Sequence, residues 1–301
     1  MAAKATALAA GDGSADRASR DGAGAAGRCM AGDATAAGGA WHPDRKLARM
    51  RVLVVVPTYN EASGIETVLR RIREELPHGH VLVVDDNSPD GTAALVDAVS
   101  SSDDHVTLLR RATKAGLGSA YLTGFAAGLD RGFDVLVEMD ADLSHDPAAL
   151  PALVSATMHG ADVAIGSRYV AGGSIPDWTR RRAFLSRWGN RYAALALGLA
   201  VNDSTSGYRA YRAAALRRLD LDHGRAYGYG FQVEMTYRLV RQGGRVVEIP
   251  VAFVDRQAGE SKMSLPIVLE AFALVTGWGV RDVLTGRRRR TPPATGVSGS
   301  P

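Results

Sequence analysis

Val135-Leu136-Val137-Glu138-Met139-Asp140-Ala141-Asp142 joins an apolar run to a pair of carboxylates and is the most informative stretch of this sequence. A short apolar run of this kind is typical of a buried β-strand. Two acids at positions i and i+2 after a strand can share one hard divalent cation. Mg²⁺ or Mn²⁺ needs only one or two protein carboxylates when phosphates complete its shell, so the pattern favours a nucleotide diphosphate site. A solvated turn is the alternative, because Asp146-Pro147 follows.

The same combination of an apolar run and a polar loop occurs earlier in the chain. Apolar runs at residues 52–56 and 81–84 predict two more strands, and a shorter strand is expected at residues 106–109. Between these strands the spacing of apolar residues predicts helices at residues 65–76, 93–99 and 120–129. Apolar strands that alternate with helices predict an α/β fold, in which helices flank a mainly parallel central sheet on both faces.

Three polar loops follow the predicted strands, at residues 57–61, 85–92 and 140–145. Ligands of open α/β sheets bind beyond the carboxyl ends of strands, so we expect the loops to converge on one crevice. Tyr59 is then a candidate to cover a base, Asp86 to accept a hydrogen bond from base or ribose, and Asp142 to hold a metal ion. A dinucleotide fingerprint at residues 116–118 is rejected, because Tyr121 occupies the third glycine position.

Composition limits the setting. The 301 residues are 46% hydrophobic, which fits one large α/β domain or two small ones. Cys29 is the only cysteine, so an internal disulfide is excluded and nothing indicates an oxidising compartment. Residues 1–46 are rich in alanine and glycine and predict a disordered tail. That segment lacks the apolar core of a signal peptide, so we expect no secretory or transit signal.

Seven motifs occur in order along the chain: PTYNE at 57–61, VDDNSPDGT at 84–92, Lys114 with GLG at 116–118, DADLSH at 140–145, GSRY at 166–169, SGYR at 206–209 and DRQAGESK at 255–262. Together they resemble the motifs of the polyprenyl-phosphate mannosyltransferases, the dolichyl-phosphate mannose synthases. This family is a branch of the inverting nucleotide-sugar transferases with the GT-A fold, a Rossmann-like fold. The resemblance therefore implies a GT-A catalytic domain at residues 47–262.

The resemblance also implies roles for residues that match the motifs. The implied nucleotide-sugar contacts are Pro57, Tyr59, Glu61, Val84, Asp86, Asp140, Ala141, Asp142, Arg168, Arg256 and Lys262. Asp140 and Asp142 would hold Mg²⁺ or Mn²⁺, and the implied catalytic residues are Asp142, Arg168, Arg256 and Lys262. Some relatives have glutamine as a third metal-facing residue where this chain has Ser144, so a third protein ligand is not expected.

The implied reaction moves mannose from GDP-mannose to a polyprenyl phosphate with inversion. A phosphate monoester has a second pKa of about 6 and is largely dianionic at neutral pH, so the nucleophile needs little help from a general base. It needs cationic groups that bring two anions together. Two alternatives remain, namely another donor such as UDP-glucose, and a non-catalytic nucleotide-binding scaffold subunit.

Residues 178–199 interleave arginines with aromatic and aliphatic residues at helical spacing, which suits a headgroup interface. An ordinary stripe that faces the core is the alternative. The family's acceptor-phosphate stretch, Arg-Arg-x-x-Ser, matches Arg181, Arg182 and Ser186 in outline.

A second candidate for membrane contact lies at residues 265–284. Between Glu270 and Arg281 it offers ten uncharged residues, about 15 Å of helix against a bilayer core of about 30 Å, so it is not expected to span a membrane. We therefore expect residues 263–301 to form an interfacial helix and a basic, disordered tail. The expected location is peripheral, on the cytoplasmic face of the cell membrane. The expected partners are an anionic membrane surface and a polytopic membrane protein, without nucleic acid.

Overall fold

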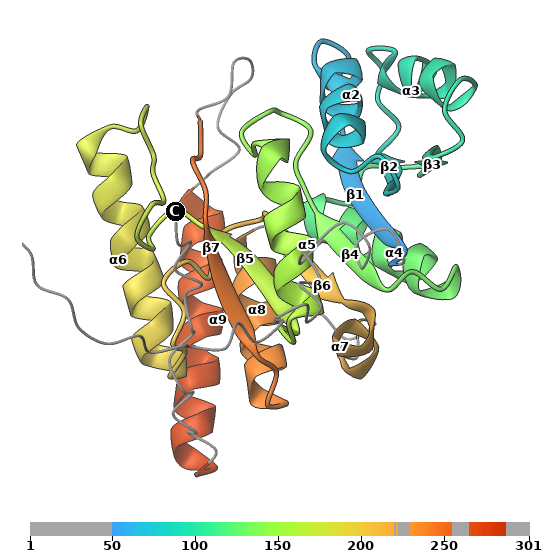
Figure 1. Ribbon diagram of the computed structural model, residues 1–301. Helices are drawn as coiled ribbons and strands as arrows, with labels where there is room; N and C mark the ends of the chain where they lie inside the picture. Colours follow the sequence, from blue (N-terminus) through green and yellow to red (C-terminus); the bar gives the residue numbers. More distant parts are fainter. Residues whose placement is uncertain (1–49, 220, 222–228, 255–264, 287–301) are drawn as a thin grey trace, which may run out of the picture. The chain divides into compact units, whose positions relative to one another are not determined.

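The computed structural model describes residues 50–219, 221, 229–254 and 265–286, and these contain a seven-stranded sheet with helices on both faces (Figure 1). The strand order is β3-β2-β1-β4-β6-β5-β7. The strands are β1 (Val52–Thr58), β2 (His80–Asp85), β3 (Val106–Arg110), β4 (Val135–Glu138), β5 (Val163–Ser167), β6 (Arg209–Arg212) and β7 (Val246–Pro250).

Strand β6 is the exception in an otherwise parallel sheet. It pairs antiparallel with β4 on one side and with β5 on the other, whereas the remaining neighbours pair in parallel. The predicted α/β fold with a mainly parallel sheet is confirmed. The sequence did not predict β6, because its four residues begin and end with arginine and do not form an apolar run.

The helices cover the two faces of the sheet in separate groups. One face is covered by α2 (Ile65–Glu75), α3 (Thr92–Ser100) and α5 (Leu150–Met158), with a short 3₁₀ helix, η1 (Pro147–Ala149), leading into α5. The other is covered by α4 (Leu117–Asp130), α7 (Ala213–Arg218) and α8 (Tyr229–Arg241). Helix α9 (Leu265–Leu284) packs against α8 and against α6 (Arg180–Leu197), as Figure 1 shows.

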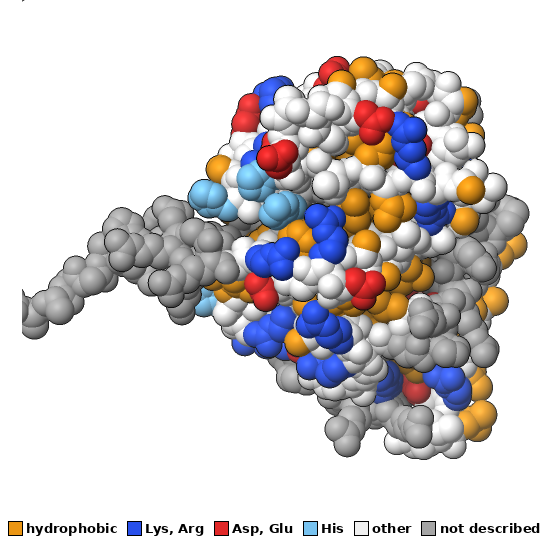
Figure 2. Space-filling model, turned by 90° about the vertical axis from the view of Figure 1, so that its right-hand side faces the viewer, with side chains coloured by type: hydrophobic (Ala, Val, Ile, Leu, Met, Phe, Trp, Pro, Cys, Tyr) orange, Lys and Arg blue, Asp and Glu red, His pale blue; other side chains and the backbone are white. Residues whose placement is uncertain are grey.

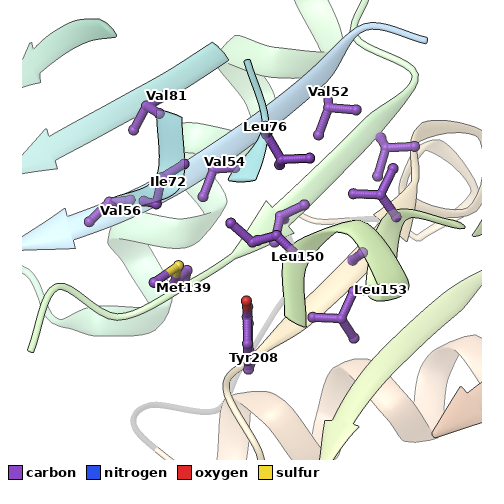
Figure 3. Packing of buried hydrophobic residues seen from close by; sticks show 14 of the residues in the cluster. Val52, Val54, Val56, Ile72, Leu76, Val81, Met139, Leu150, Leu153 and Tyr208 are labelled. Carbon is purple, nitrogen blue, oxygen red and sulfur yellow. The ribbon is translucent and has the colours of Figure 1, made fainter. Parts of the chain in front are cut away.

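Strand β1 is apolar from Val52 to Pro57 because both of its faces are covered. Val52, Val54 and Val56 point into the core under α2 and α5, while Leu53 and Val55 point into the core on the opposite face. Figure 3 shows the first of these cores. Successive side chains of a strand alternate between faces, so a strand covered on both sides must be hydrophobic throughout.

Helix α4 approaches the sheet closely through two glycines. A Cβ atom added at Gly124 would lie 2.3 Å from Cγ1 of Val55, and one at Gly128 would lie 2.7 Å from Cδ2 of Leu53. Real Cβ atoms do not approach other atoms this closely. The absence of side chains at these positions therefore fixes the distance between α4 and β1.

The helices that the sequence predicted begin and end near the expected residues, with small differences. Helix α4 starts at Leu117, three residues before its predicted start, directly after Gly116, whose positive φ of 93° favours glycine. Helix α9 occupies residues 265–284 as expected. No helix among the described residues has the length and apolarity that crossing a bilayer requires. The predicted tail at residues 1–46 and residues 287–301 lie outside the described residues, and the predicted domain boundaries stay predictions.

The close approach of α4 predicts that Gly124→Ala destabilises the protein by about 1–3 kcal/mol, because the new methyl group has no space beside Val55. Gly189→Ala in α6 is the matched control, since a Cβ there has no neighbouring atom within 4 Å. That control should gain stability by roughly 0.5–1 kcal/mol from helix propensity. Urea denaturation measures both, and equal stability of the two variants would contradict the packing described for α4.

Candidate active site

The loops that follow β1 and β2 are joined by hydrogen bonds at the carboxyl edge of the sheet. The backbone N–H of Asn60 donates to Oγ of Ser88 at 3.1 Å, and the N–H of Glu61 donates to Oγ1 of Thr92 at 3.0 Å. The third loop lies beside them, because a Cβ atom at Gly64 would be 3.8 Å from the carbonyl oxygen of Ala141. The predicted convergence of the three loops is confirmed.

Asp85 ties the first two loops together from inside the fold. Its side chain is 1% exposed and accepts hydrogen bonds from Oγ1 of Thr58 at 2.8 Å and from the N–H and Oγ of Ser88 at 2.9 and 2.6 Å. Both carboxylate oxygens of Asp85 therefore accept hydrogen bonds that hold the loops together. Of the two neighbouring acids at the end of β2, Asp85 is thus structural and Asp86 is the candidate ligand contact.

Asp86 already has a partner that the sequence did not indicate. Its Oδ1 lies 2.7 Å from Nε of Arg111 in an ion pair that is about nine-tenths buried, and its Oδ2 accepts a weaker bond from the N–H of Ala115 at 3.3 Å. Arg111 therefore orients the carboxylate predicted to contact a base or ribose. The nearby Tyr59 is covered as well, with Nζ of Lys114 3.6 Å above its ring centroid. Lys114 thus occupies a face of the ring that the prediction assigned to a base.

Each of the three loops contains one residue other than glycine in the left-handed backbone region. These are Asn60 (φ 61°), Asn87 (φ 58°) and Leu143 (φ 60°). Asparagine tolerates this conformation, but leucine does so only at a cost on the order of 1–3 kcal/mol. Strain of this kind accumulates at ligand-binding sites, so the strained Leu143 in the third loop supports a site at this edge.

The paired acids after β4 are half-buried and held by different donors. Oδ1 of Asp142 accepts from the N–H and Oγ of Ser144 at 3.1 and 2.6 Å. Oδ1 of Asp140 accepts from the hydroxyl of Tyr121 at 2.8 Å, and the N–H of Asp140 donates to Nδ1 of His145 at 3.2 Å. Ser144 is 1% exposed and donates both of these hydrogen bonds to Asp142.

These two carboxylates have the chemistry of a site for a hard divalent cation. Their oxygen atoms are the ligand type that Mg²⁺ and Mn²⁺ prefer. Within the described part of the chain, no group of three or more His, Cys, Asp or Glu side chains is placed to hold a metal ion together. A cation at Asp140 and Asp142 would therefore need further ligands from substrate phosphates or water.

Arg168 is held in a buried ion pair. Its Nε and Nη2 donate to the two carboxylate oxygens of Asp203, each at 2.7 Å, and Nη2 also donates to Oγ1 of Thr205 at 2.9 Å. Asp203 is fully buried, and its N–H donates to Oε1 of Glu248 at 2.9 Å. The sequence motif identified Arg168 but gave no indication of Asp203. The other two expected phosphate contacts, Arg256 and Lys262, lie outside the described residues.

The implied acceptor-phosphate residues lie in the first turns of α6. The helix is capped by Thr179, whose Oγ1 accepts from the N–H of Arg182 at 3.3 Å. The guanidinium of Arg182 lies 4.0 Å above the ring of Trp178. Oγ of Ser186 accepts from the hydroxyl of Tyr169 at 2.6 Å, which links α6 to the end of β5, whereas Arg181 is exposed.

Arg209 of the SGYR motif is structural. It is fully buried and donates to the carbonyl oxygens of Ser204, Ser206 and Gln232 at 2.7 to 2.9 Å. On the neighbouring strand β4, burial raises the pKa of Glu138 to about 8, although the Arg209 guanidinium opposes the rise. The glycine of the motif is closer to the candidate site, since a Cβ at Gly207 would lie 4.0 Å from Oδ2 of Asp140.

Comparison with known proteins places this arrangement in a family. The model of the family described as Glycosyl transferase family 2 matches residues 53–220. The chain is 52% identical over 241 residues to an undecaprenyl-phosphate mannosyltransferase of Micrococcus luteus, covering 80% of this chain and 99% of the relative. It is 48% identical over 239 residues to a polyprenol monophosphomannose synthase of Mycolicibacterium smegmatis, covering 79% and 90%. The chain therefore belongs to glycosyl transferase family 2.

A solved structure agrees at the level of the fold. A mannosyltransferase from Pyrobaculum calidifontis, determined in complex with GDP-Man and Mn²⁺, superposes with a TM-score of 0.54 at 22% sequence identity. The match covers 81% of this chain and 66% of that protein. The predicted GT-A fold and the resemblance to polyprenyl-phosphate mannosyltransferases are thereby confirmed. The roles of the individual site residues stay predictions.

The buried pair of Arg168 and Asp203 predicts that Asp203→Asn destabilises the fold strongly. Breaking a buried pair leaves a guanidinium without a compensating charge, at a cost of about 3–5 kcal/mol. Asp97→Asn is the matched control, because Asp97 pairs with Arg110 on an exposed surface and should contribute less than about 1 kcal/mol. Chemical denaturation distinguishes the two, and a small loss for Asp203→Asn would contradict a structural role for the pair.

Proposed function

We propose that this chain transfers mannose from GDP-mannose to polyprenyl phosphate, with inversion at the anomeric carbon. The observation that carries the proposal is the pair Asp140 and Asp142, held at the edge where the loops after β1, β2 and β4 converge. A site for a nucleotide diphosphate belongs at this edge of an α/β sheet. The polyprenyl acceptor and the mannosyl group rest on the names of the two bacterial relatives, and the GDP-linked donor on the complex of the archaeal mannosyltransferase.

Asp140 and Asp142 would hold Mg²⁺ or Mn²⁺ beside the diphosphate. The ion supplies positive charge where negative charge develops on the departing GDP. Tyr59 and Asp86 would contact the guanosine, with Pro57, Glu61 and Val84 beside them. Pro57 and Val84 are neighbours in the register of β1 and β2, which is consistent with a shared contact.

The acceptor phosphate needs cations more than it needs a base, because it is already largely dianionic. Arg182 and Ser186 in α6 are proposed to bind this phosphate, with Arg181 near them. Arg168, Arg256 and Lys262 are proposed to compensate the diphosphate charge. Arg168 would act from its anchored position beside Asp203, which holds its guanidinium in one orientation.

We further propose that α6 and α9 attach the protein to the cytoplasmic face of the cell membrane. Among the described residues ten large hydrophobic side chains are exposed, and eight of them belong to these two helices, four on each. Those on α6 are Phe184, Leu185, Trp188 and Leu195. The stripe expected in this segment is therefore not simply a core-facing one, since Phe184, Trp188 and Leu195 face outward while Leu199 is buried.

The distribution of charge supports α6 as a membrane contact. Figure 2 shows the face at the right-hand side of Figure 1, where basic side chains are interspersed with acidic and hydrophobic ones. Helix α6, at the left of Figure 1, carries Arg180, Arg181, Arg182, Arg187 and Arg191 without any acidic residue. Basic side chains beside exposed aromatic groups suit an anionic headgroup interface. A polytopic membrane protein is the alternative partner for the same surface.

Incubation with radiolabelled GDP-mannose or UDP-glucose, polyprenyl phosphate and Mn²⁺, followed by organic extraction, tests the proposed reaction. We expect label in the lipid fraction from GDP-mannose, with loss of the signal on chelation. Asp142→Asn should lower the rate by about 100-fold or more, because charge compensation at the diphosphate is reduced. Transfer from UDP-glucose alone would replace the proposed donor, and no transfer from any donor would favour a scaffold subunit.

Vesicle flotation tests the proposed membrane contact. The full chain should float with anionic vesicles, and Phe184→Ser combined with Leu185→Ser should weaken binding, because both side chains are more than half exposed. Each basic residue near the surface contributes about 1 kcal/mol, so high salt should weaken binding as well. Leu117→Ser is the control, an exposed leucine outside α6 and α9. Equal binding by all variants would contradict attachment through α6.

A further inference from the structure

Tyr121 is a buried residue with a polar contact in the candidate site. It lies on α4, is fully buried, and its hydroxyl donates to Oδ1 of Asp140 at 2.8 Å. A phenol hydroxyl that faces a carboxylate oxygen is the donor of the pair.

The tyrosine ring is held rigidly by its surroundings. It stacks with Phe125 at a centroid distance of 6.2 Å and with Phe231 at 6.5 Å. Phe231 comes this close because Gly118 has no side chain, and a Cβ there would lie 3.1 Å from Cγ of Phe231. Tyr121, Gly124 and Gly128 follow one another along about two turns of α4, and all three pack closely in the core on this face of the sheet. The hydroxyl is thus presented at a fixed point.

Two contacts then determine how Asp140 lies. Its backbone is tied to His145, which stacks on Tyr208 at 4.9 Å, and its Oδ1 is tied to Tyr121. The second oxygen, Oδ2, lies on the side of Gly207, where the missing Cβ leaves space. Fixing one oxygen of a carboxylate also fixes the direction of the other.

We propose that Tyr121 is a positioning residue that orients Asp140, so that Oδ2 faces the cation and diphosphate. The inference rests on the proposed function, since it assumes that Asp140 is a metal ligand. A carboxylate that is oriented before the metal arrives loses less conformational freedom on binding. Partners that hold metal ligands in this way typically change metal affinity by about 10–100-fold when they are removed.

Mn²⁺ binding in the presence of GDP, followed by electron paramagnetic resonance, tests the proposal without reference to turnover. Tyr121→Phe keeps the ring and its stacking but removes the hydroxyl, and it should weaken Mn²⁺ affinity by about 10–100-fold. Tyr237→Phe is the matched control, because that hydroxyl also donates to a buried carboxylate, Oδ1 of Asp282 at 2.9 Å, between α8 and α9. The control should bind Mn²⁺ as the unmodified protein does.

A double-mutant cycle with Asp140→Asn separates orientation from a general loss of structure. If Tyr121 acts through Asp140, then adding Tyr121→Phe to Asp140→Asn should change Mn²⁺ affinity less than twofold. Multiplicative losses would overturn the inference, as would equal affinity of Tyr121→Phe and the unmodified protein. Thermal melting of each variant identifies any loss that comes from unfolding. Failure of the unmodified protein to bind Mn²⁺ with GDP would instead remove the metal site of the proposed function, and the inference with it.

Discussion

Parallel pairing of β1 with both β2 and β4 is the constraint on which the rest of the structure depends. It places the carboxyl ends of three strands side by side, so that loops distant in sequence meet at one edge. Parallel pairing requires crossover connections that return the chain to the amino ends of the strands, and in this protein the helices of these connections cover both faces. Coverage on both faces explains why β1 is apolar from Val52 to Pro57, and most polar residues of the candidate site lie in the loops. Core and site therefore follow from the same strand directions.

Neighbouring residues of the same type have different tasks at this edge. Asp85 accepts the hydrogen bonds that hold two loops together, whereas Asp86 forms an ion pair with Arg111. Arg168 and Arg209 belong to two motifs of the family, yet one is paired with a carboxylate and the other mainly with carbonyl oxygens. Buried charges require partners of this kind, because desolvation without compensation is expensive. A family motif therefore identifies charged residues without telling which of them meet substrate.

Local patterns in the sequence were sufficient for β1 to β4, the helices α2, α3, α4, α6 and α9 and the convergence of the loops, but not for β5, β6 and β7 or for α5, α7 and α8. The apolar runs that end at Pro57, Asp85 and Asp140 indicated both strand direction and the edge at which ligands bind. Contacts between distant residues could not be predicted in this way. Asp203 is 35 positions from Arg168, and Tyr121 is 19 positions from Asp140. Tyr121 entered the sequence interpretation only as a reason to reject a dinucleotide motif, since a hydrogen bond from a helix to a distant loop leaves no periodic signal.

Among the described residues, every non-glycine residue with a positive φ lies in a loop of the candidate site. At the edge away from the site, the turns that lead into β4, β5 and β7 use Gly132, Gly160 and Gly243, which adopt positive φ without strain. At the site edge Leu143 adopts the same conformation at a cost in stability. A protein selected only for stability would have glycine or asparagine there. The DADLSH loop thus retains strain that the rest of the fold must offset. Replacing Leu143 by a residue that adopts this conformation easily would raise thermal stability but could change the loop shape that binding requires.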